Sequence, residues 1–192
     1  MLTLSAYGHS WVEGAGASDA SRSFVQLVAG RLRVPWRNHG VGGSSTEETA
    51  AVVSSRCRSN NDLNLVMTGL NDCRLNGGSR SSESAYARSL SAIFNSLDGS
   101  GGVTTLAIAQ PHLASYSMHA PYDRGSSQSI DRYNAILHSV ASGYPTSVVR
   151  LPKWDSLTML DPDTVHPNDL GHRTIADAVL LNLSRRFGSL RA

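Results

Sequence analysis

Four short motifs in this 192-residue chain carry side chains that could take part in catalysis. In chain order they are Gly8-His9-Ser10, Asn38-His39-Gly40-Val41-Gly42-Gly43, Gly69-Leu70-Asn71-Asp72 and Asp163-Thr164-Val165-His166-Pro167. Together they offer a hydroxyl nucleophile, hydrogen-bond donors for an oxyanion, and a carboxylate–imidazole pair. Each motif alone is typical of an ordinary turn, helix cap or loop. Their occurrence together predicts acyl chemistry at a serine.

The pair Asp163 and His166 is the candidate base for Ser10. A serine hydroxyl becomes a useful nucleophile only beside such a base. A carboxylate three residues before a histidine in a loop can turn back onto the imidazole and fix its tautomer, while the other ring nitrogen faces the serine. Pro167 and a helix cap at Asn168 or Asp169 would hold this loop in place.

An acyl-transfer site also needs donors directed at the developing oxyanion. Three are available: the backbone N–H groups of Ser10 and Gly43, and the side-chain amide of Asn71. A glycine at position 43 suits this role, because the backbone there must approach the substrate closely and adopt a positive φ.

Apolar runs and helix-like runs alternate along the chain, and they must position these motifs. Apolar runs predict five strands, over Leu2–Tyr7, Val34–His39, Leu63–Thr68, Val103–Ala109 and Ser147–Leu151. Helical spacing and caps predict five helices, over Ser23–Leu32, from the capping box at Ser45 to about Cys57, Ala85–Leu97, Ile130–Val140 and Leu170–Phe187. Loops are expected over Asn76–Ser84, Gly99–Gly102 and His112–Ser129.

This alternation predicts a single domain over residues 1–192 with a three-layer α/β/α sandwich around a five-stranded parallel sheet. In such folds, sites form beyond the carboxyl ends of the strands. Ser10, Gly43, Asn71 and His166 each follow a predicted strand. We therefore expect them at one edge of the sheet.

In these motifs the chain resembles the SGNH hydrolase superfamily, the GDSL-type esterases and lipases. Ser10, Gly43, Asn71 and His166 match its four block residues, with Asp163 three before the histidine. The resemblance implies a flavodoxin-like fold and hydrolysis of acyl esters through an acyl-serine, with no metal and no organic cofactor. The substrate would be a small or short-chain acyl ester, such as an O-acetylated sugar or metabolite.

The chain departs from the family pattern at His9, where the family usually has aspartate. That aspartate is mainly a structural hydrogen-bonding residue, so its loss affects the network around the serine and removes no catalytic group. His9 is interpreted as a structural histidine, with contact to substrate or a shifted pH profile as the alternative. Leu70 replaces a glycine, which leaves the amide of Asn71 in place.

Two other functions fit the same residues. An acyltransferase of this fold would move the acyl group to a sugar or natural-product hydroxyl from a drier pocket. A catalytically silent binding module would keep the fold alone, and His9 is the only feature that favours it.

Residues that could line a substrate pocket are less well marked by the sequence. The long predicted loop over His112–Ser129 is typical of a functional flap, and His112 and Tyr116 are candidate substrate contacts within it. Trp11 and Leu70 flank the motif residues and could line an acyl site; packing in the core is the alternative.

Composition excludes several classes of partner. The net charge is only +2, and sixteen arginines and one lysine are scattered without a run, so nucleic-acid binding is not expected. No apolar stretch reaches the ~20 residues that a membrane span needs, and no signal peptide is visible, which favours a cytoplasmic protein. The histidines show no metal-binding spacing. Cys57 and Cys73 are expected to be separate thiols, and the sequence leaves the oligomeric state open.

Overall fold

The computed structural model describes residues 2–56, 62–98 and 104–188. Its centre is a parallel five-stranded sheet with the strand order β2-β1-β3-β4-β5. The strands are β1 (Thr3–Gly8), β2 (Trp36–Gly40), β3 (Asp62–Met67), β4 (Thr104–Ile108) and β5 (Thr146–Val149). Each lies within two residues of a predicted strand, and the order is that of flavodoxin-like folds.

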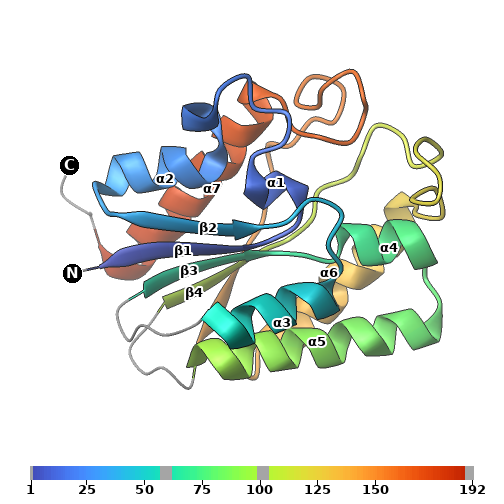
Figure 1. Ribbon diagram of the computed structural model, residues 1–192, viewed down its shortest axis with the longest axis horizontal. Helices are drawn as coiled ribbons and strands as arrows, with labels where there is room; N and C mark the ends of the chain where they lie inside the picture. Colours follow the sequence, from blue (N-terminus) through green and yellow to red (C-terminus); the bar gives the residue numbers. More distant parts are fainter. Residues whose placement is uncertain (1, 57–61, 99–103, 189–192) are drawn as a thin grey trace.

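Helices cover both faces of the sheet (Figure 1). One face carries α2 (Phe24–Leu32) and α7 (Asp169–Phe187), which pack on each other. The other carries α3 (Thr46–Arg56), α5 (Arg80–Asp98) and α6 (Ser127–Ala141). The predicted α/β/α sandwich is confirmed.

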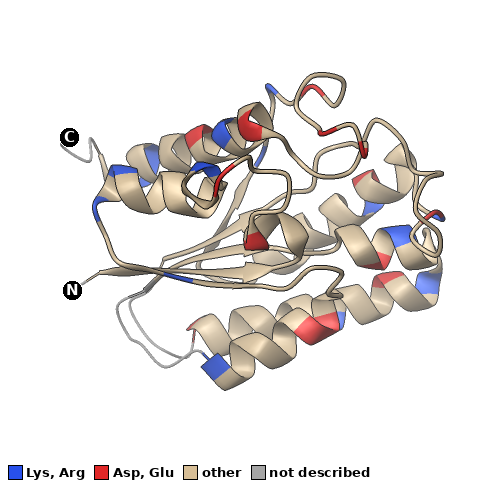
Figure 2. Cartoon of the chain, turned by 45° about the horizontal axis from the view of Figure 1, so that its top comes forward, with Lys and Arg blue, Asp and Glu red and all other residues tan. Residues whose placement is uncertain are grey.

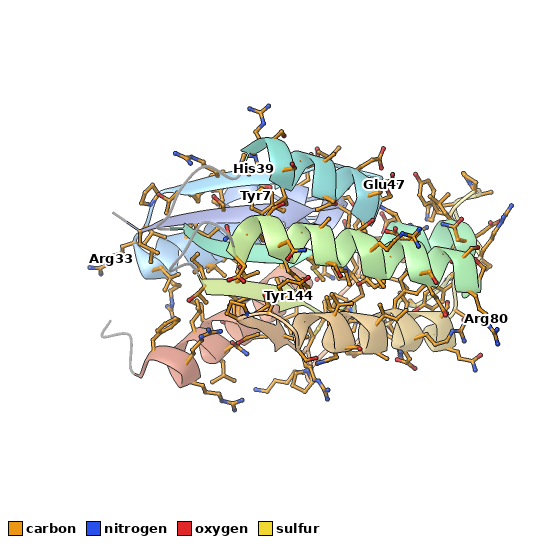
Figure 3. The ribbon with its side chains drawn as sticks, turned by 90° about the horizontal axis from the view of Figure 1, so that it is seen from below. Tyr7, Arg33, His39, Glu47, Arg80 and Tyr144 are labelled. Carbon is orange, nitrogen blue, oxygen red and sulfur yellow. The ribbon has the colours of Figure 1, made fainter. Side chains whose placement is uncertain are left out.

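The central strands of the sheet are buried because helices shield them from water on both sides. β1 shows the consequence: its residues from Leu4 to Gly8 are buried, including the polar Ser5. Tyr7 is paired in register with His39 of β2, and the two rings stack with centroids 4.9 Å apart. Figure 3 shows this pair beside α3, with α5 and α6 in front of the rest of the sheet.

Two helix caps that the sequence predicts are present. The Ser45 hydroxyl accepts a hydrogen bond from the Glu48 N–H (3.2 Å), and the Glu48 carboxylate accepts one from the Ser45 N–H (2.8 Å). This reciprocal box begins α3. The Asn168 side chain accepts hydrogen bonds from the first turn of α7. Both caps fix elements that adjoin the motif residues.

The start of α5 and a short helix before it differ from the prediction. The expected loop over Asn76–Ser84 is wrong in its second half, because α5 begins at Arg80 with a polar turn capped by Ser79. Helix α4 (Leu70–Asn76) was not predicted. It is too short to show an amphipathic period, and such helices depend on tertiary packing for their stability. Similarly, α6 begins at Ser127, inside the expected loop over His112–Ser129, through a capping box of Ser126 and Ser129.

Other features bear on the predicted partners. Within the described ranges, no helix is both long and apolar enough to cross a membrane. Basic and acidic residues are interspersed over the helices (Figure 2).

Cys73 is buried with its Sγ 3.1 Å from the Ser129 hydroxyl. Cys57 lies outside the described residues, so the prediction of separate thiols stays a prediction.

Candidate active site

Ser10 is the first residue of α1 (Ser10–Glu13), a short helix that follows β1 directly. The strand arrowheads point toward α1 and α4, so both helices lie at the carboxyl edge of the sheet (Figure 1). His9 caps α1, with its Nδ1 accepting a hydrogen bond from the Trp11 N–H (3.3 Å). This cap fixes the turn that carries the Ser10 hydroxyl.

The segment after β5 brings Asp163 and His166 to Ser10. The Nε2 atom of His166 lies 3.0 Å from Ser10 Oγ, and its Nδ1 atom lies 2.5 Å from Asp163 Oδ2. All three residues are partly exposed. This geometry allows a proton to pass from the hydroxyl to the ring, with the carboxylate orienting the ring.

Hydrogen bonds within the loop hold the carboxylate of Asp163. Its Oδ1 atom accepts hydrogen bonds from the backbone N–H groups of Val165 and His166, both at 2.9 Å. Burial raises the pKa of Asp163, but these hydrogen bonds and the imidazole of His166 outweigh it and lower the pKa below its usual value. The carboxylate therefore stays charged, as an orienting group requires.

A close contact at Gly16 joins the segment after α1 to the loop of His166. Gly16 has a φ of +88°, and a Cβ atom there would lie 2.2 Å from the Pro167 carbonyl oxygen and 3.1 Å from the Cβ of His166. Buried His172 reinforces the contact, with its Nε2 atom 3.1 Å from the Ala15 carbonyl oxygen. Only glycine allows the backbones to approach this closely.

Gly16→Ala is therefore expected to separate His166 from Ser10. Positive φ alone costs about 1–2 kcal/mol for a residue with a Cβ atom, and the contact with Pro167 adds to this. We expect a loss of at least about 2 kcal/mol in the free energy of unfolding, measured in urea, together with a large fall in esterase kcat. Gly30→Ala is the control: nothing lies within 4 Å of its added Cβ, so that variant should gain about 0.5–1 kcal/mol. Equal effects of the two variants would contradict the role of this contact.

The proposed oxyanion donors come from two neighbouring turns. Gly43 has a φ of +77°, which confirms the expected positive value. Buried Asn71 lies in the first turn of α4 and donates one hydrogen bond from Nδ2 to the Ser44 carbonyl oxygen (2.9 Å). Because the amide has a second N–H, this bond ties Asn71 to the turn of Gly43 and leaves one donor for a ligand.

His9 is fully buried, which excludes the alternative of direct contact with substrate. Its Nε2 atom lies 2.8 Å from the side-chain nitrogen of Gln110, which is itself buried beyond β4. Burial, with a smaller contribution from His166, lowers the pKa of His9 to about 3. His9 is thus a neutral structural residue at physiological pH.

Because His9 is buried in its neutral form, we expect the protein to lose stability at acidic pH. The pKa of His9 falls from 6.5 to about 3 on folding. Between these two pH values, His9 is protonated in the unfolded chain but neutral in the folded protein. The stabilisation is complete above about pH 6.5 and is lost progressively as the pH falls toward 3. Between pH 7.5 and 4.5 we expect His9 to account for a loss of about 2–3 kcal/mol.

The measurement is urea unfolding at both pH values for the wild type and His9→Asn, which keeps a capping side chain but does not titrate. The variant should lose less stability on acidification than the wild type. The same loss in both proteins would contradict a neutral, buried His9.

Two of the four candidate substrate contacts are buried in the core, and the other two lie on the segment after β4. Trp11 and Leu70 are fully buried in the hydrophobic core, so the expectation that they line an acyl site is wrong and the core alternative holds. His112 pairs with Asp131 (2.8 Å) and lines a hollow of about 830 Å³ between α6 and the segment after β5. Tyr116 is partly buried, and its hydroxyl accepts a hydrogen bond from the Leu113 N–H (3.1 Å).

Residues 118–122 make contacts at the site that the sequence did not assign. The Nε2 atom of His119 lies 2.8 Å from the Asp163 carbonyl oxygen, and the Tyr122 hydroxyl donates to the Gly43 carbonyl oxygen at 3.4 Å. The segment thus bridges the Asp163 loop and the Gly43 turn. Its length and aromatic content were the only sequence signals for this role.

No cluster of three His, Cys, Asp or Glu side chains suited to a metal ion occurs in the part of the chain that the structure describes. The expectation of a reaction without metal or cofactor stays a prediction. Its basis is the serine, imidazole and carboxylate just described.

Comparisons with known proteins bear on the family and the fold of the chain. Residues 6–174 match the model of the GDSL-like lipase/acylhydrolase family, whereas the comparison with curated proteins found no match. The lipase/acylhydrolase from Enterococcus faecalis has 18% identity and a TM-score of 0.78, with 100% of each chain covered. A carbohydrate acetylesterase from Sinorhizobium meliloti has 14% identity and a TM-score of 0.76, covering 97% of this chain and 100% of that one. At these identities, the structural likeness shows a shared fold.

Proposed function

Because the chain belongs to the GDSL-like lipase/acylhydrolase family, we propose that it is a serine esterase that hydrolyses a small or short-chain acyl ester. The observation that carries this proposal is the chain of contacts from Ser10 Oγ to His166 Nε2 (3.0 Å) and from His166 Nδ1 to Asp163 Oδ2 (2.5 Å). It supplies a nucleophile, a base and an orienting carboxylate.

In the first half of the proposed reaction, Ser10 Oγ attacks the ester carbonyl carbon while His166 Nε2 takes its proton. The carbonyl oxygen becomes an oxyanion, which accepts hydrogen bonds from the N–H groups of Ser10 and Gly43 and from the Asn71 amide. The bond to the leaving alcohol then breaks, and the proton on His166 passes to the alcohol oxygen. An acyl-serine and a free alcohol result.

Water completes the cycle by the same route. His166 takes a proton from a water molecule, whose oxygen attacks the acyl carbon and forms a second oxyanion held by the same donors. The bond to Ser10 breaks, the serine regains its proton from His166, and the carboxylic acid leaves. Asp163 stabilises the protonated imidazole in both halves.

The Gly43 turn, which carries one of the proposed oxyanion donors, borders a small hollow. It has a volume of about 340 Å³ and is lined by Gly42, Ser44, Glu48 and Tyr122 among others, but not by Ser10 or Asn71. The carbohydrate acetylesterase with the same fold supports including O-acetylated sugars among the candidates. The experiment is a panel of p-nitrophenyl esters of increasing chain length together with acetylated sugars, with Ser10→Ala as the background. Acetyl and other short esters should give the highest kcat/KM, and a preference for long chains would contradict the proposal.

Transfer to an alcohol other than water would use the same residues. Product analysis in the presence of sugar hydroxyls separates the two reactions. Hydrolysis predicts free acid as the only acyl product, and an acylated sugar as the main product would assign transfer instead.

A further inference from the structure

Arg74 is a buried cation next to the proposed active site, and the reaction described above does not use it. It lies on α4 three residues after Asn71, so the two side chains share one side of the helix. Only 5% of its surface is exposed. Its position therefore follows from the same helix that positions a proposed oxyanion donor.

The guanidinium of Arg74 lacks the partners that a buried charge normally has. Its Nε and Nη2 atoms are buried and form no hydrogen bond with any residue that the structure describes. Arg22 and Arg132, by contrast, contact carboxylates at 2.9 and 2.8 Å. Leaving a buried charge unpaired is costly, so this arrangement calls for an explanation.

The two unpaired atoms lie on one edge of the guanidinium. The N–H groups of Nε and Nη2 point in parallel from that edge, which is a geometry that matches the two oxygens of a carboxylate. The unused donors are thus a complete bidentate pair and not two unrelated atoms.

The surroundings of Arg74 connect its guanidinium to the reaction site. The guanidinium carbon lies 5.5 Å from the centre of the Tyr122 ring, and the Tyr122 hydroxyl contacts Gly43. Burial lowers the pKa of Arg74, and the negative charge of Asp163 opposes this shift. Arg74 therefore lies within electrostatic range of Asp163 and under the segment that also touches Gly43.

We propose that Arg74 binds a carboxylate carried by the ester substrate, so that the preferred substrates are anionic esters. This inference rests on the proposed esterase function and names its substrate class. Because the Nε and Nη2 atoms are buried, the side chains around the guanidinium, of which Tyr122 is one, must turn aside to admit the carboxylate. Tyr122 is itself only partly buried, and its contact with Gly43 is a long hydrogen bond of 3.4 Å.

The test compares matched pairs of esters that differ by one negative charge. Mono-p-nitrophenyl succinate and its methyl ester place the charge on the acyl side, whereas p-acetoxybenzoate and its methyl ester place it on the alcohol side. For one of the two pairs, Arg74→Gln should lower the ratio of kcat/KM for the anionic over the neutral ester by about tenfold or more. Arg74→Lys should lower the ratio less, because it keeps the charge and loses the paired donors.

Arg124→Gln is the matched control, since it removes the same charge from an exposed position on the neighbouring segment. It should leave the ratio unchanged for both pairs. If Arg74→Gln lowers kcat/KM of the anionic and neutral esters by the same factor, Arg74 has a structural role and the inference is overturned. If Arg124→Gln lowers the ratio of kcat/KM for the anionic over the neutral ester by the same factor, the effect comes from net charge and the inference is also overturned.

Binding to Ser10→Ala separates this inference from the proposed function. Calorimetric titration of that variant with the anionic ester should show binding that is lost in the double variant Ser10→Ala/Arg74→Gln. If the wild type hydrolyses none of the esters but this binding is present, the esterase proposal fails and the carboxylate site stands. If the wild type hydrolyses the neutral esters but Arg74 affects neither the binding nor the ratio, the esterase proposal stands and the carboxylate site fails.

Discussion

Ser10→Ala is expected to lower kcat for p-nitrophenyl acetate by about 10⁵- to 10⁶-fold. The variant removes the oxygen that His166 Nε2 contacts at 3.0 Å, and no acyl-enzyme can then form. The donors of Gly43 and Asn71 remain, so a small rate above the uncatalysed reaction should persist. Steady-state release of p-nitrophenol measures the effect.

Ser84→Ala is the control for this variant, because it removes an exposed hydroxyl from α5, a helix that supplies no residue to the proposed site. Its kcat should equal that of the wild type, and both variants should keep the thermal midpoint of the parent. A Ser10→Ala enzyme with even a hundredth of the wild-type kcat would show that Ser10 is not the nucleophile.

Asp163→Asn should lower kcat by about 10⁴-fold near neutral pH. The Asp163 carboxylate accepts from His166 Nδ1, so Nε2 is left without a proton and can take one from Ser10. An amide nitrogen in that place would instead favour the tautomer with its proton on Nε2, and the negative charge that stabilises the imidazolium would be lost. KM should change much less than kcat, because the substrate does not touch Asp163.

Asp161→Asn provides the matched control in the same loop. It removes an equal charge two residues away, while the backbone N–H of Asp161 keeps its 2.8 Å hydrogen bond to the His166 carbonyl oxygen. We expect a change in kcat of less than about tenfold. A similar loss in both variants would attribute the effect to the general charge of the loop and not to the contact with His166.

The positions of the motif residues could be predicted because they depend on local signals. Each follows a run that forms a strand of the parallel sheet, and parallel strands end at the same edge of their sheet. The cap at Asn168 and the box at Ser45 were likewise readable, since capping uses residues three or fewer positions apart. The resemblance to the GDSL-type family is confirmed by the family match.

Arg74 and Tyr122 could not be predicted in the same way. Arg74 depends on α4, which is seven residues long and has no periodic pattern of its own. Tyr122 reaches Gly43 across 79 residues of sequence from a segment without regular structure. Trp11 was predicted wrongly for a related reason. Its place next to Ser10 suggested that it lines a pocket, but its side chain packs in the core. These contacts depend on tertiary packing.

Covalent labelling with a fluorophosphonate tests the central claim, that Ser10 is activated by His166, most directly. Intact-mass spectrometry of the wild type should show one adduct per chain, and peptide mapping should place it on Ser10. His166→Ala and Ser10→Ala should remain unlabelled under the same conditions. A wild-type protein that stays unlabelled, or one labelled at another serine, would contradict the account.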